Sequence, residues 1–190
     1  MGFLLVLVMI LTSCVQNNSS DQKDNNKPNI LKEKETKRPN ILLVMVDDMG
    51  WTDTQPFGGE ISTQTIDKLA KNGMMFTDFH ASVSCSPTRS MLLSGTDNHI
   101  AGLGNMGELL TPNQVGKPGH EGYLNNNVAS MAEVLKEAGY HTYMGGKWHL
   151  GHDMSSIPGA RGFEKSLSLL NGGASHFDDM AALMGADHIE

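Results

Sequence analysis

Residues 41–48 read ILLVMVDD, six apolar residues in a row followed at once by two acidic ones. A continuous apolar run of this length is typical of a strand that is buried on both faces within a parallel sheet. The run stops abruptly at Asp47 and Asp48, as expected where such a strand reaches the edge of its sheet. The stretch therefore predicts an α/β fold with a mostly parallel sheet.

Segments further along the chain alternate between helical and extended patterns. Helices are expected over residues 65–71, 87–94 and 128–138, and strands over 74–80 and 140–144. The expected caps are Asn127 before the third helix and the glycines Gly73, Gly95 and Gly139 after the three helices. Strands that alternate with helices indicate βαβ units and a parallel sheet flanked by helices.

Composition places the chain among globular proteins. Of its 190 residues, 39% are hydrophobic and 18% are charged, and the net charge is -7. No basic stripe runs through the sequence, which argues against a nucleic-acid partner. Residues 96–127 form a long stretch rich in Gly and Asn without a regular pattern, and we expect it to border a functional site.

The N-terminus has the pattern of an export signal. The apolar run 3–11 is shorter than the about 20 residues that span a bilayer, and it resembles the core of a signal peptide. It leads into Leu11-Thr12-Ser13-Cys14, which resembles a bacterial lipobox, where the Cys is lipidated and the preceding residues are removed. We therefore predict a lipoprotein signal over residues 1–13 and lipidation of Cys14. An ordinary signal peptide with an incidental Cys is the alternative. No Lys or Arg precedes the apolar run, which departs from the usual pattern and indicates a start further upstream.

A polar tether is expected over residues 14–38. Residues 15–38 carry six basic and four acidic side chains and show no periodicity. The predicted location is the cell envelope, as a periplasmic or outer-membrane lipoprotein held to the membrane by its lipid anchor. Cys14 and Cys85 are the two cysteines of the sequence, and a disulfide between them is disfavoured because each has another predicted role.

Residues 85–95 read CSPTRSMLLSG and carry the strongest chemical pattern. Cys85 stands at the start of a predicted helix, where free backbone N–H groups and the helix dipole favour an anion. Arg89 follows four residues later on the same face, and a guanidinium suits tetrahedral oxyanions. On these residues alone, a buried structural Cys with a surface Arg remains the alternative.

Two further motifs follow predicted strands, so we expect them at the same edge of the sheet. The adjacent carboxylates Asp47 and Asp48 repel each other, and a hard cation such as Ca²⁺ or Mg²⁺ would offset this; a solvated loop or a helix cap is the alternative. Lys147 and His149 lie two apart in an expected extended segment, which points both to one side and Trp148 to the other.

Together these motifs resemble the sulfatase family of the alkaline phosphatase superfamily. The run CSPTRSMLLSG matches the first family signature, GKWHLG at 146–151 resembles the second, and residues 39–50 resemble the first strand with its metal ligands. The stretches GTDNHIAG at 95–102 and RGFE at 161–164 are similar to bacterial arylsulfatases. Gln64-Thr65 departs from the usual Pro-Asn, with an expected effect on helix entry alone.

The resemblance implies a sulfuric ester hydrolase whose nucleophile derives from Cys85. A formylglycine-generating maturation enzyme would oxidise Cys85 to an aldehyde, and the hydrated aldehyde would attack the sulfur of a sulfate ester. Loss of a proton from the second hydroxyl would then expel sulfate. Asp47 and Asp48 would bind Ca²⁺, with Mg²⁺ as the alternative, together with the oxygen of modified Cys85.

Three more residues receive roles from the resemblance. Arg89 would hold the formylglycine oxygens on the cation side, Lys147 would bind the formylglycine and the sulfate, and His149 would be the general base for the second hydroxyl. His176 either lines the pocket or belongs to a loop. The family needs further ligands from later sequence, so residues 39–190 are expected to be an incomplete catalytic domain that is inactive alone.

Two other functions remain open from the sequence. A phosphomonoester or phosphonate hydrolase of the same superfamily would share the metal site, and the residues that decide between them lie beyond Glu190. A non-catalytic envelope lipoprotein could retain the fold, but the intact set Cys85, Arg89, Lys147 and His149 argues against it.

The anchor is testable in the full-length protein. With Cys14 as the site of lipidation, we expect the wild-type protein to sediment with membranes and Cys14→Ala to remain soluble after export. Membrane fractionation with immunoblotting measures this. Sedimentation of Cys14→Ala with the membranes would refute the lipid anchor.

Overall fold

The computed structural model describes residues 38–175 and 177. The predicted signal, Cys14, most of the tether and His176 lie outside these residues. The chain divides into two units, 1–44 and 45–190; the described part of the first, residues 38–44, is extended. Within the described part of the chain, no helix combines the length and the apolar character needed to cross a membrane.

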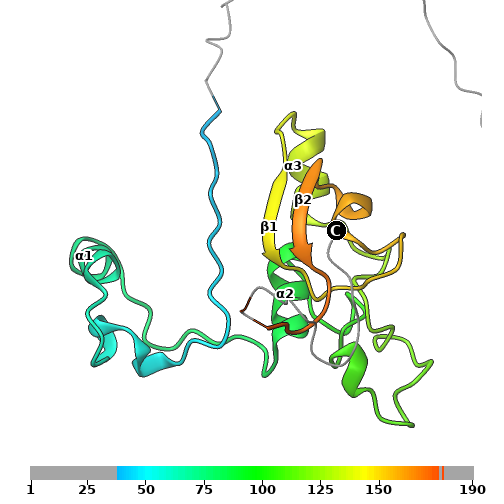
Figure 1. Ribbon diagram of the computed structural model, residues 1–190, viewed down its shortest axis with the longest axis horizontal. Coiled ribbons are helices and arrows are strands. Elements are labelled where there is room, and N and C mark those ends of the chain that lie inside the picture. The colour runs from blue at the N-terminus through cyan, green and yellow to red at the C-terminus, as the bar shows by residue number, and fades with distance from the viewer. Residues whose placement is uncertain (1–37, 176, 178–190) are drawn as a thin grey trace, which may run out of the picture. The chain divides into compact units, whose positions relative to one another are not determined.

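The second unit contains three α-helices and two strands in its described part (Figure 1). The elements are α1 (Gln64–Asn72), α2 (Cys85–Ser94), α3 (Met131–Glu137), β1 (Tyr143–Lys147) and β2 (Lys165–Leu169), with short 3-10 turns at η1 (Trp51–Asp53), η2 (Gln55–Phe57), η3 (Gly107–Leu109) and η4 (Pro158–Arg161). Strands β1 and β2 lie side by side and are parallel, in a register that runs from Tyr143 opposite Lys165 to Lys147 opposite Leu169. The parallel pair with helices confirms the α/β prediction.

Two predicted strands are absent from the described structure. Residues 41–46 are extended but unpaired, and Leu42 and Val44 are 88% and 73% exposed. Residues 74–80 form an irregular segment with a bend at 77–78. Both predictions were wrong for one physical reason: a strand forms only when its backbone groups pair with a neighbour, and β1 and β2 are the only paired strands among the described residues.

The helices follow the sequence closely, with shifts that local hydrogen bonds explain. Helix α2 begins at Cys85, two residues earlier than expected, and Gly95 ends it in the left-handed conformation, with its N–H donating to the carbonyl of Met91 at 2.8 Å. Gly73 and Gly139 also follow their helices as expected. Asn127 was wrong as a cap, because α3 starts three residues later than predicted.

Ser130 is the cap that sets the start of α3. Its Oγ accepts the N–H of Glu133 at 3.1 Å, and the carboxylate of Glu133 accepts the N–H of Ser130 at 2.6 Å. This reciprocal pair satisfies two N–H groups at the helix start. Strand β1 is likewise shifted: it begins at Tyr143 rather than at 140, since the N–H of Tyr140 still bonds back to Leu135 in the turn after α3.

The core includes side chains from the segment that follows β1. Its buried members are Ala101, Leu103, Leu124, Trp148, Leu150, Ile157 and Leu170. Trp148 is fully buried, donates from Nε1 to the carbonyl of Ser156 at 2.9 Å, and meets the ring of Phe163 edge-on at 6.1 Å. The segment that carries Lys147 and His149 is therefore anchored by the side chain between them.

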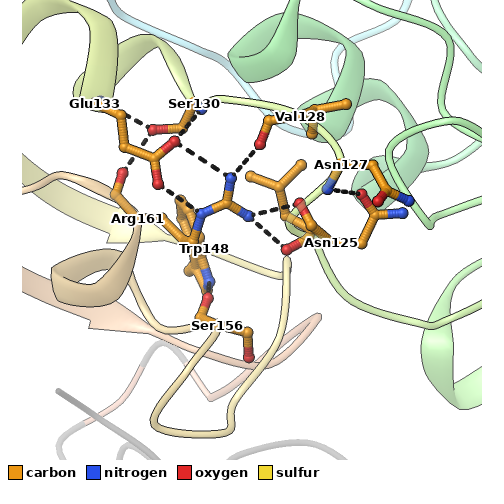
Figure 2. Close-up of polar contacts among 9 residues, drawn as sticks. Asn125, Asn127, Val128, Ser130, Glu133, Trp148, Ser156 and Arg161 are labelled. Atoms are coloured by element: carbon orange, nitrogen blue, oxygen red, sulfur yellow. Dashed lines mark hydrogen bonds and ion pairs between the residues drawn. The ribbon is translucent and has the colours of Figure 1, made fainter.

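A buried arginine joins the loops around this core (Figure 2). Arg161 is 2% exposed and donates to the carbonyls of Leu124, Asn125 and Val128 at 2.5, 3.1 and 2.7 Å, and to the carboxylate of Glu133 at 2.9 Å. Burial raises the pKa of Glu133, but the hydrogen bonds from Arg161 and from the Ser130 N–H outweigh it and the pKa is lowered. The guanidinium thus holds residues 124–128, α3 and the β1–β2 connection together.

Replacing this arginine should destabilise the fold. In the full-length protein, Arg161→Ala should lower the free energy of unfolding by about 3–5 kcal/mol, because it leaves buried carbonyls and a carboxylate unpaired. Arg161→Lys should recover only part of the loss, since an ammonium cannot reproduce the planar fork of donors. Urea unfolding measures both.

The control is Lys136→Ala, an exposed cation on α3 whose loss should stay within about 0.5 kcal/mol. Wild-type stability of Arg161→Lys would contradict the role given to the planar fork.

Candidate functional site

Cys85 is the first residue of α2 and carries a free, half-buried thiol. Ser84 before it is extended, so the helix starts sharply and its first N–H groups have no partner within the helix. The thiol Sγ lies 3.8 Å from Sδ of Met106, in the turn that leads to η3. The predicted position of Cys85 at a helix start is thus confirmed.

Arg89 connects α2 to the end of β1. It lies one turn along the helix, is 9% exposed, and donates from a terminal nitrogen to the carbonyl of Lys147 at 2.6 Å. Its other terminal nitrogen lies 3.6 Å from a carboxylate oxygen of Asp47. Its Nε is buried and has no hydrogen-bond partner among the described residues.

Asp47 lies between two cations. Nζ of Lys147, whose side chain is 15% exposed, donates to the Asp47 carboxylate at 2.6 Å. Partial burial raises the pKa of Asp47, but the hydrogen bond from Lys147 and the charges of Lys147 and Arg89 outweigh it, so the pKa falls below its ordinary value of 3.8. The carboxylate is therefore ionised throughout the neutral range.

Asp48 differs from its neighbour in both conformation and contacts. It has a left-handed backbone with a φ of 52°, is exposed, and makes no ion pair or hydrogen bond with the residues that the structure describes. The charge that offsets the Asp47–Asp48 repulsion comes here from Lys147 and Arg89.

The donors at this place suit a hard cation only in part. Carboxylate oxygens such as those of Asp47 and Asp48 are ligands that Ca²⁺ and Mg²⁺ prefer, but Ca²⁺ takes about 6–8 oxygens. Residues 38–175 and 177 contain no cluster of three or more His, Cys, Asp or Glu side chains able to hold a metal. The two carboxylates therefore fit as one part of a larger ligand set.

His149 is buried and paired with an acidic residue. It is 7% exposed, and its Nε2 lies 2.8 Å from Oε1 of Glu108. Burial lowers the pKa of His149, Glu108 raises it, and Lys147 and Arg89 lower it, for a net lowering that favours the neutral ring. Its backbone is left-handed with a φ of 57°, so the expected extended segment ends before this residue.

Glu108 is the site residue that sequence reasoning missed. It lies in η3, within the stretch 96–127 that was expected to border the site. Met106 contacts Cys85 and Glu108 contacts His149, so the structure supports that expectation. Glu108 belongs to none of the motifs, and nothing in the sequence other than its place in this stretch points to it.

The structure thus brings most of the predicted site residues into one region. Asp47, Arg89 and Lys147 are joined by direct contacts, and the charges of Arg89 and Lys147 act on His149. Cys85 lies one turn before Arg89 on the same helix. A thiol at a helix start, two cations and a neutral imidazole form a group that can bind an oxyanion and move a proton.

Comparisons with known proteins agree with this chemistry. A family model described as Sulfatase matches residues 39–181. The chain is 56% identical over 149 residues to an uncharacterized sulfatase of Schizosaccharomyces pombe, covering 77% of this chain and 27% of that protein. It is 43% identical over 146 residues to an arylsulfatase of Klebsiella aerogenes, covering 77% of this chain and 31% of that protein.

Solved structures give the same picture. The crystal structure of Ps i-CgsB is similar with a TM-score of 0.63 and 32% identity, over 75% of this chain and 30% of that one. The crystal structure of the PsFucS1 sulfatase from Pseudoalteromonas sp. is similar with a TM-score of 0.56 and 28% identity, over 71% and 26% of the two chains. The chain spans less than a third of the length of these relatives.

Proposed function

The chain belongs to the sulfatase family, and on that premise we propose that the complete protein hydrolyses sulfate esters through a nucleophile made from Cys85. The observation that carries the proposal is the position of Cys85 at the first residue of α2, one turn before a buried Arg89 that is bonded to the Lys147 carbonyl and faces Asp47. Aryl or other small sulfate esters are the proposed substrates.

The nucleophile requires a change in Cys85. A separate formylglycine-generating enzyme would carry out a two-electron oxidation with an external oxidant such as dioxygen as the electron acceptor. The β-carbon would lose its sulfur at the sulfide level and gain an oxygen from water, leaving an aldehyde. Water adds to the aldehyde and gives two hydroxyl groups on one carbon. These hydroxyls would stand at the start of α2, where the free N–H groups and the helix dipole stabilise negative charge.

Turnover then divides into two steps at this residue. One hydroxyl oxygen attacks the sulfur and gives up its proton, the bond from sulfur to the ester oxygen breaks, and that oxygen takes up a proton and leaves as the alcohol. A sulfated hemiacetal remains. The other hydroxyl gives up its proton to His149, the bond between carbon and the sulfate oxygen breaks, and sulfate departs as the aldehyde forms again. His149 suits this step because its lowered pKa keeps the ring neutral and able to accept a proton.

The charged residues would bind the sulfate and a cation. Lys147 and Arg89 provide positive charge for the sulfate and formylglycine oxygens. Asp47 and Asp48 would supply oxygen ligands to Ca²⁺, with Mg²⁺ as the alternative, and the bound ion would stabilise charge on the attacking oxygen. We also propose, from the sequence alone, that an export signal over residues 1–13 and lipidation of Cys14 would hold the enzyme in the cell envelope.

The nucleophile is tested by labelling the full-length protein produced with a maturation enzyme. A peptide containing residue 85 should react with a hydrazide, and mass spectrometry should show that this residue has gained one oxygen and lost its sulfur and two hydrogens. Cys85→Ala should abolish both the labelling and the hydrolysis of an aryl sulfate. Cys85→Ser should also abolish turnover where the maturation enzyme acts on Cys alone.

Cys14→Ala is the matched control and should keep both the label and the activity. An active protein with unmodified Cys85 would refute the nucleophile. Faster turnover of a phosphate monoester than of the aryl sulfate would instead support the phosphohydrolase alternative.

The cation is tested at Asp48. In the full-length protein, Asp48→Ala should lose the bound Ca²⁺ and nearly all activity, because the exposed carboxylate has no other partner among the described residues. Elemental analysis after dialysis measures the metal. Asp67→Asn, which alters only an exposed pair with Lys71 on α1, is the control and should leave the metal in place. Unchanged metal content in Asp48→Ala would contradict the assignment.

A further inference from the structure

The contact between Glu108 and His149 joins the proposed general base to a carboxylate that has no part in the steps of turnover. We propose that Glu108 is a positioning residue: it holds the His149 ring and keeps a proton on Nε2, so that Nδ1 is the atom that accepts the proton during turnover. The inference rests on the proposed function and adds to it the atom that acts as base and the residue that selects this atom.

The chemistry of the contact fixes the tautomer. Oε1 of Glu108 lies 2.8 Å from Nε2, and an ionised carboxylate can only accept a hydrogen bond. Nε2 must therefore carry the hydrogen, and in the neutral ring the lone pair lies on Nδ1. Nδ1 is buried and has no hydrogen-bond partner among the described residues. A buried acceptor without a donor is uncommon in folded proteins and indicates a role that the resting structure does not fill.

One short turn reaches both groups that would react. Met106, at the start of the turn, contacts the thiol of Cys85 at 3.8 Å, and Glu108, two residues on, contacts His149. On the other side, the hydrogen bond from Arg89 to the Lys147 carbonyl ties α2 to the segment that carries His149. Glu108 therefore fixes the imidazole in the same framework that holds Cys85.

The backbone encloses the pair at Gly172. A Cβ at this position would lie 2.7 Å from Cε1 and 2.8 Å from Nε2 of His149, and 2.9 Å from Oε1 of Glu108. Even a methyl group would force the imidazole or the carboxylate to move. Gly172→Ala thus offers a way to disturb the contact without changing either partner.

The charges that face His149 make the role measurable. Glu108 raises the pKa of His149, whereas burial and the charges of Lys147 and Arg89 lower it. In Glu108→Gln the amide oxygen can still accept the Nε2–H, but the negative charge is lost. The pKa of His149 should then fall, and because a general base works only when deprotonated, the acid limb of the kcat profile should move to lower pH.

The experiment measures aryl sulfate hydrolysis against pH with the matured full-length protein. Glu108→Ala and Gly172→Ala should each lower kcat by about tenfold to a hundredfold, with a smaller change in KM. Glu108→Gln should keep a higher kcat than Glu108→Ala and shift the acid limb downward. Glu137→Gln, an exposed glutamate on α3, is the matched control and should behave as wild type.

A second measurement does not depend on turnover. In ¹⁵N-histidine NMR, the wild-type protein should show His149 with the proton on Nε2. Glu108→Ala and Glu108→Gln, whose amide can either accept from Nε2–H or donate to Nε2, should show the other tautomer as well. Thermal unfolding checks that each variant is folded. If Glu108→Ala does not fold, the kcat and the pH profile of Glu108→Gln test the role of Glu108. If folded Glu108 variants kept the wild-type kcat and the wild-type acid limb, the positioning role of Glu108 would be overturned and the proposed function would stand. A matured wild-type protein without sulfatase activity would overturn the proposed function itself.

Discussion

The described fold depends on the burial of the Arg161 guanidinium. A buried cation is tolerated only when its donors find acceptors, and Arg161 finds three backbone carbonyls and one carboxylate within residues 124–133, which lie 28 to 37 positions before it in the sequence. The first of these residues continues the restraint: the N–H of Leu124 donates to the carbonyl of Leu150 at 2.9 Å. The position of the residue after His149 is thus linked to a guanidinium that takes no part in the chemistry.

This link explains how a short parallel pair can present a chemical site. The side chain of Trp148 is fixed in the core between Ser156 and Phe163, so Lys147 and His149, on either side of it, have little freedom. Lys147 meets Asp47, Arg89 holds the Lys147 carbonyl, and Glu108 holds His149. Each charged group is restrained by a partner that comes from another segment, and this arrangement favours a pre-organised site over one that must assemble on the substrate.

The sequence predicts the parts of this structure that depend on local signals. Spacing and motif order predict helix α2 with the glycine that ends it, and they predict the extent of α1. They also predict that Asp47, Arg89 and Lys147 lie in one region. Whether residues 41–46 pair with another strand cannot be predicted in this way. Apolar character shows that a segment can enter a sheet, but it does not show which strand would lie beside it. Glu108 was missed for a related reason: its partner His149 is 41 residues away, and no periodic pattern joins them.

Backbone conformation adds evidence that the motif order alone lacks. Among the described residues, Asp48 and His149 are the two non-glycine positions with positive φ. The left-handed conformation is unfavourable by about 1–2 kcal/mol for residues with a Cβ, and it persists where the surrounding structure holds it or function requires it. Each follows an extended segment. Asp48 is next to Asp47, and His149 is two residues after Lys147, in the two motifs that resemble family signatures. For His149 the restraints are visible in the buried Trp148 and in Glu108. For Asp48 the described residues show no such restraint, but Asp adopts the left-handed conformation more readily than most residues, because its short polar side chain can hydrogen-bond locally.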